Sequence, residues 1–342
     1  MYNVIMTAFL GVSLVACAVP YAWSQEFYKD KTLRIIVGVS PGAQHDIYAR
    51  LMTRYMPKYI PGNPSMIVEN MPGAGGLVAA SHIYHRVKPD GLTIGAYSGH
   101  MIVRHVLGHK DVTIDGRELG WLGAFVPASQ VCTLTKASGI KTAGAWRAAK
   151  RPVVLGGLSP GSDTVDLPKI VAATTTLPIR VVEGFKGVAD AIQAAHGGEI
   201  DGICFAWYGM RATWGQALDA GEVRVILQNV LDPVPELPNV PLVTTYAKDD
   251  VTRELLQAAL KVYSPPVFVH SVAPGTPQER LQILQNAFAH ALKDPELVKT
   301  TEQMKLEIKP IDGPSLTRIF RELYKVSPEL IAKIQKITLP TK

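Results

Sequence analysis

The sequence predicts an α/β fold with two similar halves. Apolar strand segments alternate with helical segments along most of the chain, a pattern typical of parallel sheets covered by helices. A strand, a polar loop and a helix follow one another at 33–56, and a similar unit recurs about 120 residues later at 151–174. Two extended apolar segments, 121–126 and 261–270, join the halves. If the chain crosses twice, it forms two discontinuous α/β domains with two crossover strands and a cleft between them.

In the first half, the spacing of apolar residues predicts each element. Residues 33–39 are almost wholly apolar and predict a buried strand. The segment 47–56 has apolar residues at helical spacing, with Arg50 and Arg54 on the other face, and a proline-glycine cluster at 61–64 ends it. The elements that follow are a strand at 66–69, a loop at 70–76, a helix at 77–87 and a strand at 93–97.

The second half repeats this alternation. Its predicted elements are a strand at 151–155, a glycine-rich loop at 156–163, a helix at 167–174, a strand at 179–182, a helix at 188–195 and strands at 200–205 and 223–227. Further on, Thr276 and Glu279 flank Pro277 in the pattern of a capping box, with apolar residues at helical spacing after it. We therefore expect a helix that is capped by Thr276.

Composition favours a globular protein with a small anionic ligand. The 342 residues are 47% hydrophobic and 19% charged, with a formal net charge of +6. Basicity favours anionic partners. Because the lysines and arginines are scattered and no nucleic-acid-binding motif is visible, we expect a small anion and no nucleic acid.

The N-terminal segment predicts export. Residues 4–19 form an apolar run that is too short for a comfortable membrane span. Small residues at Ala22 and Ser24 suit a signal peptidase that cuts before Gln25, so residues 1–24 are predicted to be a signal peptide and the mature protein to be periplasmic. A lipoprotein-type pattern ending at Cys17, which would be acylated, is the alternative.

Cys132 and Cys204 are the cysteines of the predicted mature chain. An oxidising compartment permits a disulfide between them, although spacing alone says nothing about their geometry. We favour two buried thiols that pack as small apolar side chains.

The first polar loop, Ser40-Pro41-Gly42-Ala43-Gln44-His45-Asp46, leads from a strand into a helix. Amides at the start of a helix lack internal partners and attract anions, so this loop is predicted to hold one. Asp46 is interpreted first as the N-cap of the helix and second as a ligand contact. His45 fits equally a charged clamp on a carboxylate and a solvated loop residue.

Two features of the sequence are compatible with a catalytic or metal site. The segment 157–161 reads G-L-S-P-G and matches the nucleophile elbow of serine hydrolases, with Ser159 as the nucleophile. Pro160 has no N–H to donate to an oxyanion, so an exported hydrolase is only the alternative function. Paired histidines at 82 and 85 and at 105 and 109 lack an accompanying acidic or cysteine cluster, so no metal, no cofactor and no enzyme activity are predicted.

Five segments, in order, resemble a known family. They are the strand, loop and helix at 35–50, ENMPGAGG at 69–76, KPDGLT at 88–93, EGFKG at 183–187, and the region from APGTP at 273–277 to KDPE at 293–296. Together they resemble the Bug-type (TctC-like) periplasmic solute-binding proteins of tripartite tricarboxylate transporters. The chain departs from the pattern at Ala43 and Gln44, where the family has glycines, and at Asp166, near a common histidine.

The resemblance implies a two-lobed, type II (Venus-flytrap) periplasmic-binding-protein fold. It predicts domain 1 at 25–124 plus 266–342 and domain 2 at 125–265. It also implies capture of a small organic anion, a carboxylate, in the cleft and its delivery to the permease subunits of a tripartite transporter by a monomeric protein. A binding protein that feeds a signalling kinase is a further alternative. Dicarboxylates, tricarboxylates, aromatic acids and amides all remain open as ligands.

The same resemblance places the ligand at both loops and at nearby strand ends. Carboxylates in the family are held mainly by backbone N–H groups and bridging waters, and we expect the amides of both loops to act in this way. The predicted ligand-binding residues are Ser40, Pro41, Gly42, Ala43, Gln44, His45, Asp46, Ser98, Ser159, Gly161, Ser162, Asp163, Phe185 and Trp207.

Overall fold

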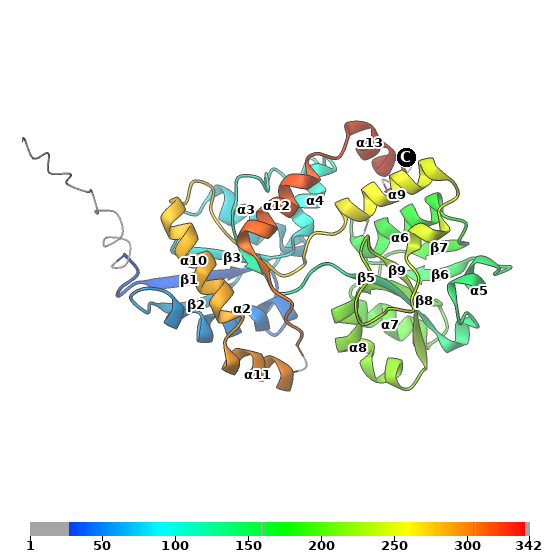
Figure 1. Cartoon of the computed structure of the whole chain (residues 1–342), viewed down its shortest axis with the longest axis horizontal. Helices are drawn as coiled ribbons and strands as arrows, with labels where there is room; N and C mark the ends of the chain where they lie inside the picture. The colour runs from blue at the N-terminus through cyan, green and yellow to red at the C-terminus, as the bar shows by residue number, and fades with distance from the viewer. Residues whose placement is uncertain (1–26, 159, 305, 339–342) are drawn as a thin grey trace, which may run out of the picture.

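The computed structural model describes residues 27–158, 160–304 and 306–338 and contains two mixed sheets side by side (Figure 1). The predicted signal peptide, Cys17 and Ser159 lie outside the described residues. The first sheet has the order β11-β4-β10-β3-β1-β2. Its strands are β1 (Thr32–Val37), β2 (Ser65–Asn70), β3 (Thr93–Tyr97), β4 (Gly120–Ala124), β10 (Val269–Val272) and β11 (Ile311–Asp312).

The second sheet has the order β7-β6-β8-β5-β9. Its strands are β5 (Gln130–Thr135), β6 (Val153–Gly156), β7 (Ile179–Val182), β8 (Gly202–Ala206) and β9 (Val223–Asn229). The βαβ units give parallel pairs, whereas β10 runs antiparallel to β3 and β4, and β5 runs antiparallel to β8 and β9. The expected parallel pairing is therefore confirmed for the βαβ units, and both sheets are mixed because the strands that follow each crossing enter their sheet in the opposite direction.

The strands of the first sheet are buried on both faces because helices cover both sides of it. On β1, Leu33 and Ile35 belong to one core cluster with residues of α2 (Gln44–Tyr55) and α10 (Gln278–Ala291). Ile36 points to the opposite face, as alternation along a strand requires, and joins a second cluster. That second face is covered by α3 (Leu77–His85), α4 (His100–Val106) and α12 (Gly313–Leu323).

The second sheet is built in the same way. One face packs on α5 (Ala143–Arg147), α6 (Asp163–Thr174) and α9 (Asp250–Val262), and the other on α7 (Val188–His196) and α8 (Trp207–Asp219). α11 (Pro295–Gln303) lies near α2, where Tyr55 bonds Thr300. Within the described residues, no helix has the length and apolar character needed to cross a bilayer.

Two connections, 125–129 and 263–268, lead from one sheet to the other. The predicted domain boundaries after residues 124 and 265 fall at the end of β4 and within the second connection. Residues 261 and 262 belong to the end of α9 rather than to an extended segment. The last helix, α13 (Pro328–Thr338), packs against α6 and α9 beside the second sheet (Figure 1). The chain therefore passes between the two sheets a third time near its C-terminal end.

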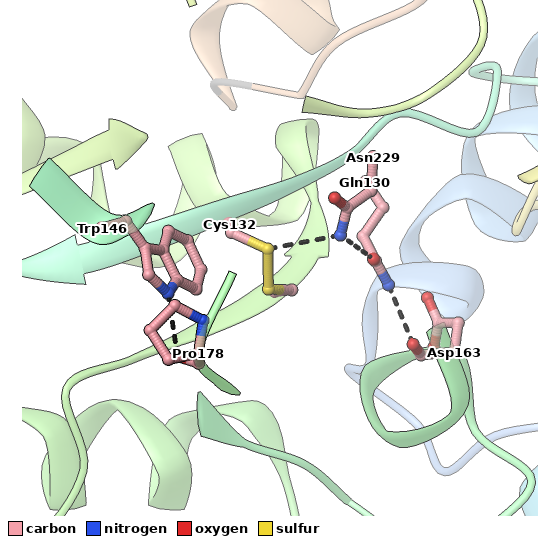
Figure 2. The surroundings of a disulfide bond; sticks show 7 residues. Gln130, Cys132, Trp146, Asp163, Pro178 and Asn229 are labelled. Carbon is pink, nitrogen blue, oxygen red and sulfur yellow. Dashed lines mark hydrogen bonds between the residues drawn. A yellow bond between two sulfur atoms is a disulfide. The ribbon is translucent and has the colours of Figure 1, made fainter. Parts of the chain in front are cut away.

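Cys132 and Cys204 form a disulfide. They are register partners on the antiparallel strands β5 and β8, with their Cα atoms 4.0 Å apart, and both are buried (Figure 2). The favoured prediction of two separate thiols was wrong. Pairing of strands 72 residues apart places the two side chains together, and no local pattern reports that pairing.

Two local predictions also differ from the structure. α10 begins at Gln278 with Pro277 as its cap, and the Thr276 hydroxyl donates to the carbonyl of Ala273, so Thr276 does not cap the helix. Trp207 and Tyr208 begin α8 instead of extending a strand, and both are buried.

Candidate functional site

The first loop joins β1 to α2. Its leading residues, Ser40, Pro41 and Gly42, are exposed, and Gly42 has φ +82°, a left-handed conformation that suits glycine. α2 begins at Gln44, with Ala43 as an N-cap that offers no side-chain hydrogen bond. Because the first amides of any α-helix lack intrahelical acceptors, residues 44–46 present unpaired N–H groups at this end of α2.

Asp46 is buried and lies in the first turn of α2, so the interpretation of Asp46 as the N-cap was wrong. Its carboxylate accepts hydrogen bonds from the Gly42 amide at 2.8 Å, from Arg50 at 2.9 and 3.0 Å and from Asn70 at 2.8 Å. Burial alone would raise the pKa of Asp46, but these hydrogen bonds lower it below its usual value. Asp46 therefore holds the loop in shape, and the Gly42 amide is occupied within the protein.

The second loop repeats this arrangement at the start of α6. Gly161 has φ +84°, Ser162 is the N-cap residue, and Asp163 is the first helical residue. The Gly161 amide donates to Oδ1 of Asp166 at 3.2 Å, as the Gly42 amide does to Asp46. Contrary to expectation, the two glycine amides are thus bound to carboxylates of their own helices and do not face each other as free donors.

His45 is held by the second connection. Its ring lies 4.4 Å from that of Phe268, and its Nε2 is 3.0 Å from the carbonyl oxygen of Val267. Burial lowers the pKa of His45 to about 4, and the hydrogen bond to Val267 only partly opposes this. The imidazole is therefore neutral near pH 7 in the ligand-free protein, and the side chain is partly exposed and packs against the second connection. A contact between His45 and a carboxylate ligand stays a prediction.

A small pocket lies beside both connections, between the two sheets. We call it the crossover pocket. It encloses about 10 Å³, room for roughly one water-sized group. Its polar lining consists of His100, Ser129, Gln130, Asp163, Asn229, Tyr263 and Ser264. His100 comes from the start of α4 and Asp163 from the start of α6, so both halves of the fold contribute to it.

Three buried polar atoms of this lining have no hydrogen-bond partner in the described part of the chain. They are Nε2 of His100, Oγ of Ser129 and Oδ1 of Asn229. Leaving a buried polar group unpaired costs about 1–3 kcal/mol, and natural proteins contain few such groups. Three such atoms belong to residues that line this one pocket.

Two of the predicted ligand-binding residues, Ser98 and Asp163, lie at the crossover pocket and contact His100. Oγ of Ser98 lies 3.2 Å from Nδ1 of His100 and accepts from the His100 amide at 3.3 Å, so it fixes the ring. The other ring nitrogen, Nε2, faces Oδ2 of Asp163 at 4.0 Å. The structure therefore brings Ser98 and Asp163 to one site, with His45 beside it through Val267.

Phe185 and Trp207 lie outside the crossover pocket. Phe185 is half-buried and its ring approaches Gly156. Trp207 is buried, and its amide donates to the carbonyl of Ser129 at 2.7 Å. The side chain of Trp207 lines a separate groove of about 740 Å³ together with Arg211, Glu236, Leu237, Leu306 and Glu307. Beside this groove, Lys309 pairs with Glu236 and Glu307 and so links segments of the two halves.

Sequence reasoning missed six polar residues of the crossover pocket: His100, Ser129, Gln130, Asn229, Tyr263 and Ser264. One signal was available. Gln228 and Asn229 are polar residues at the end of an apolar strand, and Ser129 and Gln130 open another. Polar residues at strand ends of α/β sheets often line binding sites. Among the described residues, no three His, Cys, Asp or Glu side chains gather as a metal site requires.

The family model of the tripartite tricarboxylate transporter family receptor, TctC, matches residues 49–336. A UPF0065 protein in the gbd 5′ region of Cupriavidus necator is 22% identical over 341 residues, which cover 96% of this chain and 94% of the relative. A UPF0065 protein of Bordetella bronchiseptica is 30% identical over 112 residues, so the chain matches about a third of that relative (32%).

Solved structures share the fold. A TctC solute-binding protein from Polaromonas aligns with a TM-score of 0.69 and 18% identity, over 90% of this chain and 99% of its own. MatC from Rhodopseudomonas palustris, solved with bound malate, aligns with a TM-score of 0.62 and 19% identity, over 88% of this chain and 99% of its own. A further R. palustris protein, solved with adipate, has a TM-score of 0.65 and 18% identity, over 90% and 98%.

These similarities agree with the two-lobed periplasmic-binding-protein fold of the structure. The family model describes receptors and the aligned proteins are solute-binding proteins, so this chain is a binding protein and not an enzyme. The chain belongs to the TctC family of tripartite tricarboxylate transporter receptors.

Proposed function

We propose that this protein captures a small carboxylate between its two halves and delivers it to the permease of a tripartite tricarboxylate-type transporter. The observation that carries the proposal is that residues of both halves, among them His100 at the start of α4 and Asp163 at the start of α6, line one pocket between the two sheets. Malate and adipate in the two R. palustris proteins support a carboxylate as the ligand class.

The carboxylate would be held at the start of α2. The Gly42 amide is already bound to Asp46, which leaves the amides of residues 44–46 as the donors. Charge-assisted hydrogen bonds to such amides orient an anion strongly, and the positive end of the helix dipole adds to them. His45 contacts the carbonyl of Val267, which lines the crossover pocket, so the start of α2 lies near that pocket.

The two halves would close around the ligand. We propose domain 1 at 25–124 plus 266–342 and domain 2 at 125–265, with connections 125–129 and 263–268 and the third passage between α12 and α13 as the hinge. Closure of two domains about a few connecting residues is a common response to ligand binding. α13 packs against α6 and α9 of domain 2, so the end of the chain would move with that half.

The location and partners follow from the family. We propose an exported, periplasmic, monomeric protein, with residues 1–24 as its signal peptide and a lipid anchor at Cys17 as the alternative. Proteins of the TctC type serve tripartite transporters, so the membrane permease is the proposed recipient of the ligand.

Thermal unfolding in the presence of a carboxylate library tests the ligand class. A ligand that binds only the folded state at 100 times its Kd adds about 2.7 kcal/mol to stability, which raises the Tm measurably. We expect one or more carboxylates to raise the Tm, and the matching uncharged amides or esters to have no effect. A library in which no carboxylate shifts the Tm contradicts the proposal.

A further inference from the structure

A cluster of charged and aromatic side chains joins the two halves on the side of α8. The ammonium group of Lys309 lies 3.1 Å from Oε1 of Glu307 in its own half and pairs with Glu236, which lies in the loop after β9 in the other half. The same ammonium group lies 5.5 Å from the centre of the Tyr208 ring, at the start of α8. Lys309 therefore contacts side chains of both halves, and we call these four residues the Lys309 clasp.

The first half fixes the position of Lys309. Its backbone amide donates to the carbonyl oxygen of Phe125, at the start of the first connection, at 2.8 Å. The carbonyl oxygen of Glu307 accepts from the hydroxyl of Tyr48 on α2 at 2.9 Å. Because both contacts tie this segment to the first half, any turn of the second half moves its two clasp residues relative to Lys309.

On the opposite side of the connections, α13 joins the two halves through buried contacts. α13 packs against α6 and α9 in the second half, and Nε2 of Gln335 donates to the carbonyl oxygen of Leu107, at the end of α4 in the first half, at 2.5 Å. Ile334 of α13 is buried in one apolar cluster with Leu107 and with Leu260 of α9. Figure 1 shows α9 and α13 above the connections and α8 below them. The two halves are therefore joined on two opposite sides.

The contact on the α8 side is the weaker of the two. The side chains of Lys309, Glu236 and Glu307 are 37%, 40% and 33% exposed. An exposed ion pair contributes only about 0–1 kcal/mol and is weakened further by salt. Exposing one buried Leu or Ile side chain, as separation at α13 would require, costs roughly 1.5–3 kcal/mol. A groove of about 740 Å³, lined by both halves, already lies beside the clasp. The halves therefore separate at lower cost on the α8 side.

We propose that the two halves open on the α8 side by turning about the α13 side, and that the Lys309 clasp sets how far apart they stand there. This movement is the domain closure of the proposed function, on which the proposal rests; the opening side and its controlling residue are new. Because salt screens exposed charges, the opening should widen as ionic strength rises. The movement is measured without a ligand, so it can fail while carboxylate capture stands.

Double electron–electron resonance on the ligand-free protein, expressed without the predicted signal peptide, measures both sides. The remaining native cysteines form the disulfide, so spin labels attach to introduced cysteines. One label pair, Ala212→Cys on α8 and Gln303→Cys on α11, spans the α8 side (Figure 1). The other, Gln257→Cys on α9 and Lys110→Cys after α4, spans the α13 side. All four positions are exposed.

Charge reversal and its rescue separate the clasp from a general effect of mutation. Lys309→Glu gathers three carboxylates where the halves meet, and adding Glu236→Lys restores opposite charges across the contact. Arg34→Glu is the matched control, because Arg34 forms a similarly exposed pair with Glu69 inside the first sheet. Circular dichroism verifies that each variant is folded, and Lys309→Met serves if Lys309→Glu is not.

The expected result in Lys309→Glu is a mean distance across the α8 side that is longer by about 5 Å or more, with a much smaller change across the α13 side. Lys309→Met and high salt should lengthen the α8-side distance in the same direction. The exchanged pair and Arg34→Glu should match the wild type. An unchanged α8-side distance, a similar change on both sides, or an exchange that fails to restore the wild-type distance overturns the inference. Each of these results leaves the proposed carboxylate capture standing.

Discussion

The hydroxyl of Tyr263 donates to Oδ2 of Asp166 at 2.7 Å, and both side chains are buried. Tyr263 closes α9 at the start of the second connection, and Asp166 accepts a hydrogen bond from the Gly161 amide in the second loop. This contact ties the proposed hinge to the second loop. It also places a carboxyl group where burial opposes its charge.

Asp166 should make stability depend on pH. Burial raises the pKa of Asp166 to about 6, although Tyr263 and Gly161 partly oppose this. A raised carboxyl pKa means that the folded state binds the proton more tightly than the unfolded state, so stability falls as pH rises from about 4 to about 6. Asp166→Asn removes that loss. We expect its Tm, relative to the wild type, to increase as pH rises from about 4 to about 6 and to stay level above that, in ligand-free protein.

Melting curves of wild type and Asp166→Asn between pH 4 and pH 8 measure this difference. An unchanged Tm difference across that range would show that Asp166 does not titrate there. Asp232→Asn, at an exposed position in the loop after β9, serves as the matched control and should show no such trend.

The disulfide should contribute strongly to stability. A bond that closes a loop of 72 residues restricts the unfolded chain, which predicts about 4 kcal/mol from chain entropy. The variant Cys132→Ala with Cys204→Ala should therefore unfold at a markedly lower denaturant concentration. Reductant should destabilise the wild type and leave the double variant unaffected. Equal midpoints for the two proteins would contradict the expectation.

His270 should destabilise the fold in acid. It is buried beside Phe125 and Phe288, and neither ring nitrogen has a partner in the described ranges. Burial lowers the pKa of His270 to about 3, and the nearby His45 adds to this. Because the unfolded chain binds the proton more readily, stability falls as pH drops below about 6.5.

His270→Met replaces the unpaired ring nitrogens with an apolar side chain. We expect a higher Tm than the wild type, by more at pH 5 than at pH 7.5, in differential scanning calorimetry. His290→Met, at an exposed histidine on α10, should behave like the wild type at both pH values. A lower Tm for His270→Met at pH 5 would show that its ring nitrogens are satisfied.

Asp46 should be structural. Asp46→Ala leaves the Gly42 amide, Arg50 and Asn70 without their shared acceptor, which predicts a loss of about 3 kcal/mol. Asp219→Ala breaks an exposed pair with Arg211 and should cost less than about 1 kcal/mol. Urea unfolding measures both, and similar losses for the two variants would refute the structural role of Asp46.

Much of the fold was predictable because it rests on local patterns. The strands at β1, β3, β6 and β8 are apolar runs between turns, and α2 has a clear helical period. The pairing of strands that lie far apart in the sequence could not be predicted from local patterns. The antiparallel direction of β5 and β10 and the disulfide both depend on that pairing. The start of α8 at Trp207 was also missed, because aromatic residues suit a strand as well as a helix.

The candidate site was predictable only where loops lead into helices. Ser98, His45 and Asp163 meet at or beside the crossover pocket, as expected of residues at strand ends and helix starts. The roles of Gly42 and Gly161 could not be predicted from the sequence, because their amides donate hydrogen bonds to carboxylates about one helical turn later in the chain. Asn229 and Gln130 act through hydrogen bonds between distant segments, and their spacing in the sequence does not show those contacts.

A crystal structure with the carboxylate that raises the Tm most is the most direct test of a ligand held between the two halves. It should show the ligand's carboxylate within hydrogen-bond distance of the amides of residues 44–46. A ligand bound elsewhere, with these amides untouched, would contradict the account.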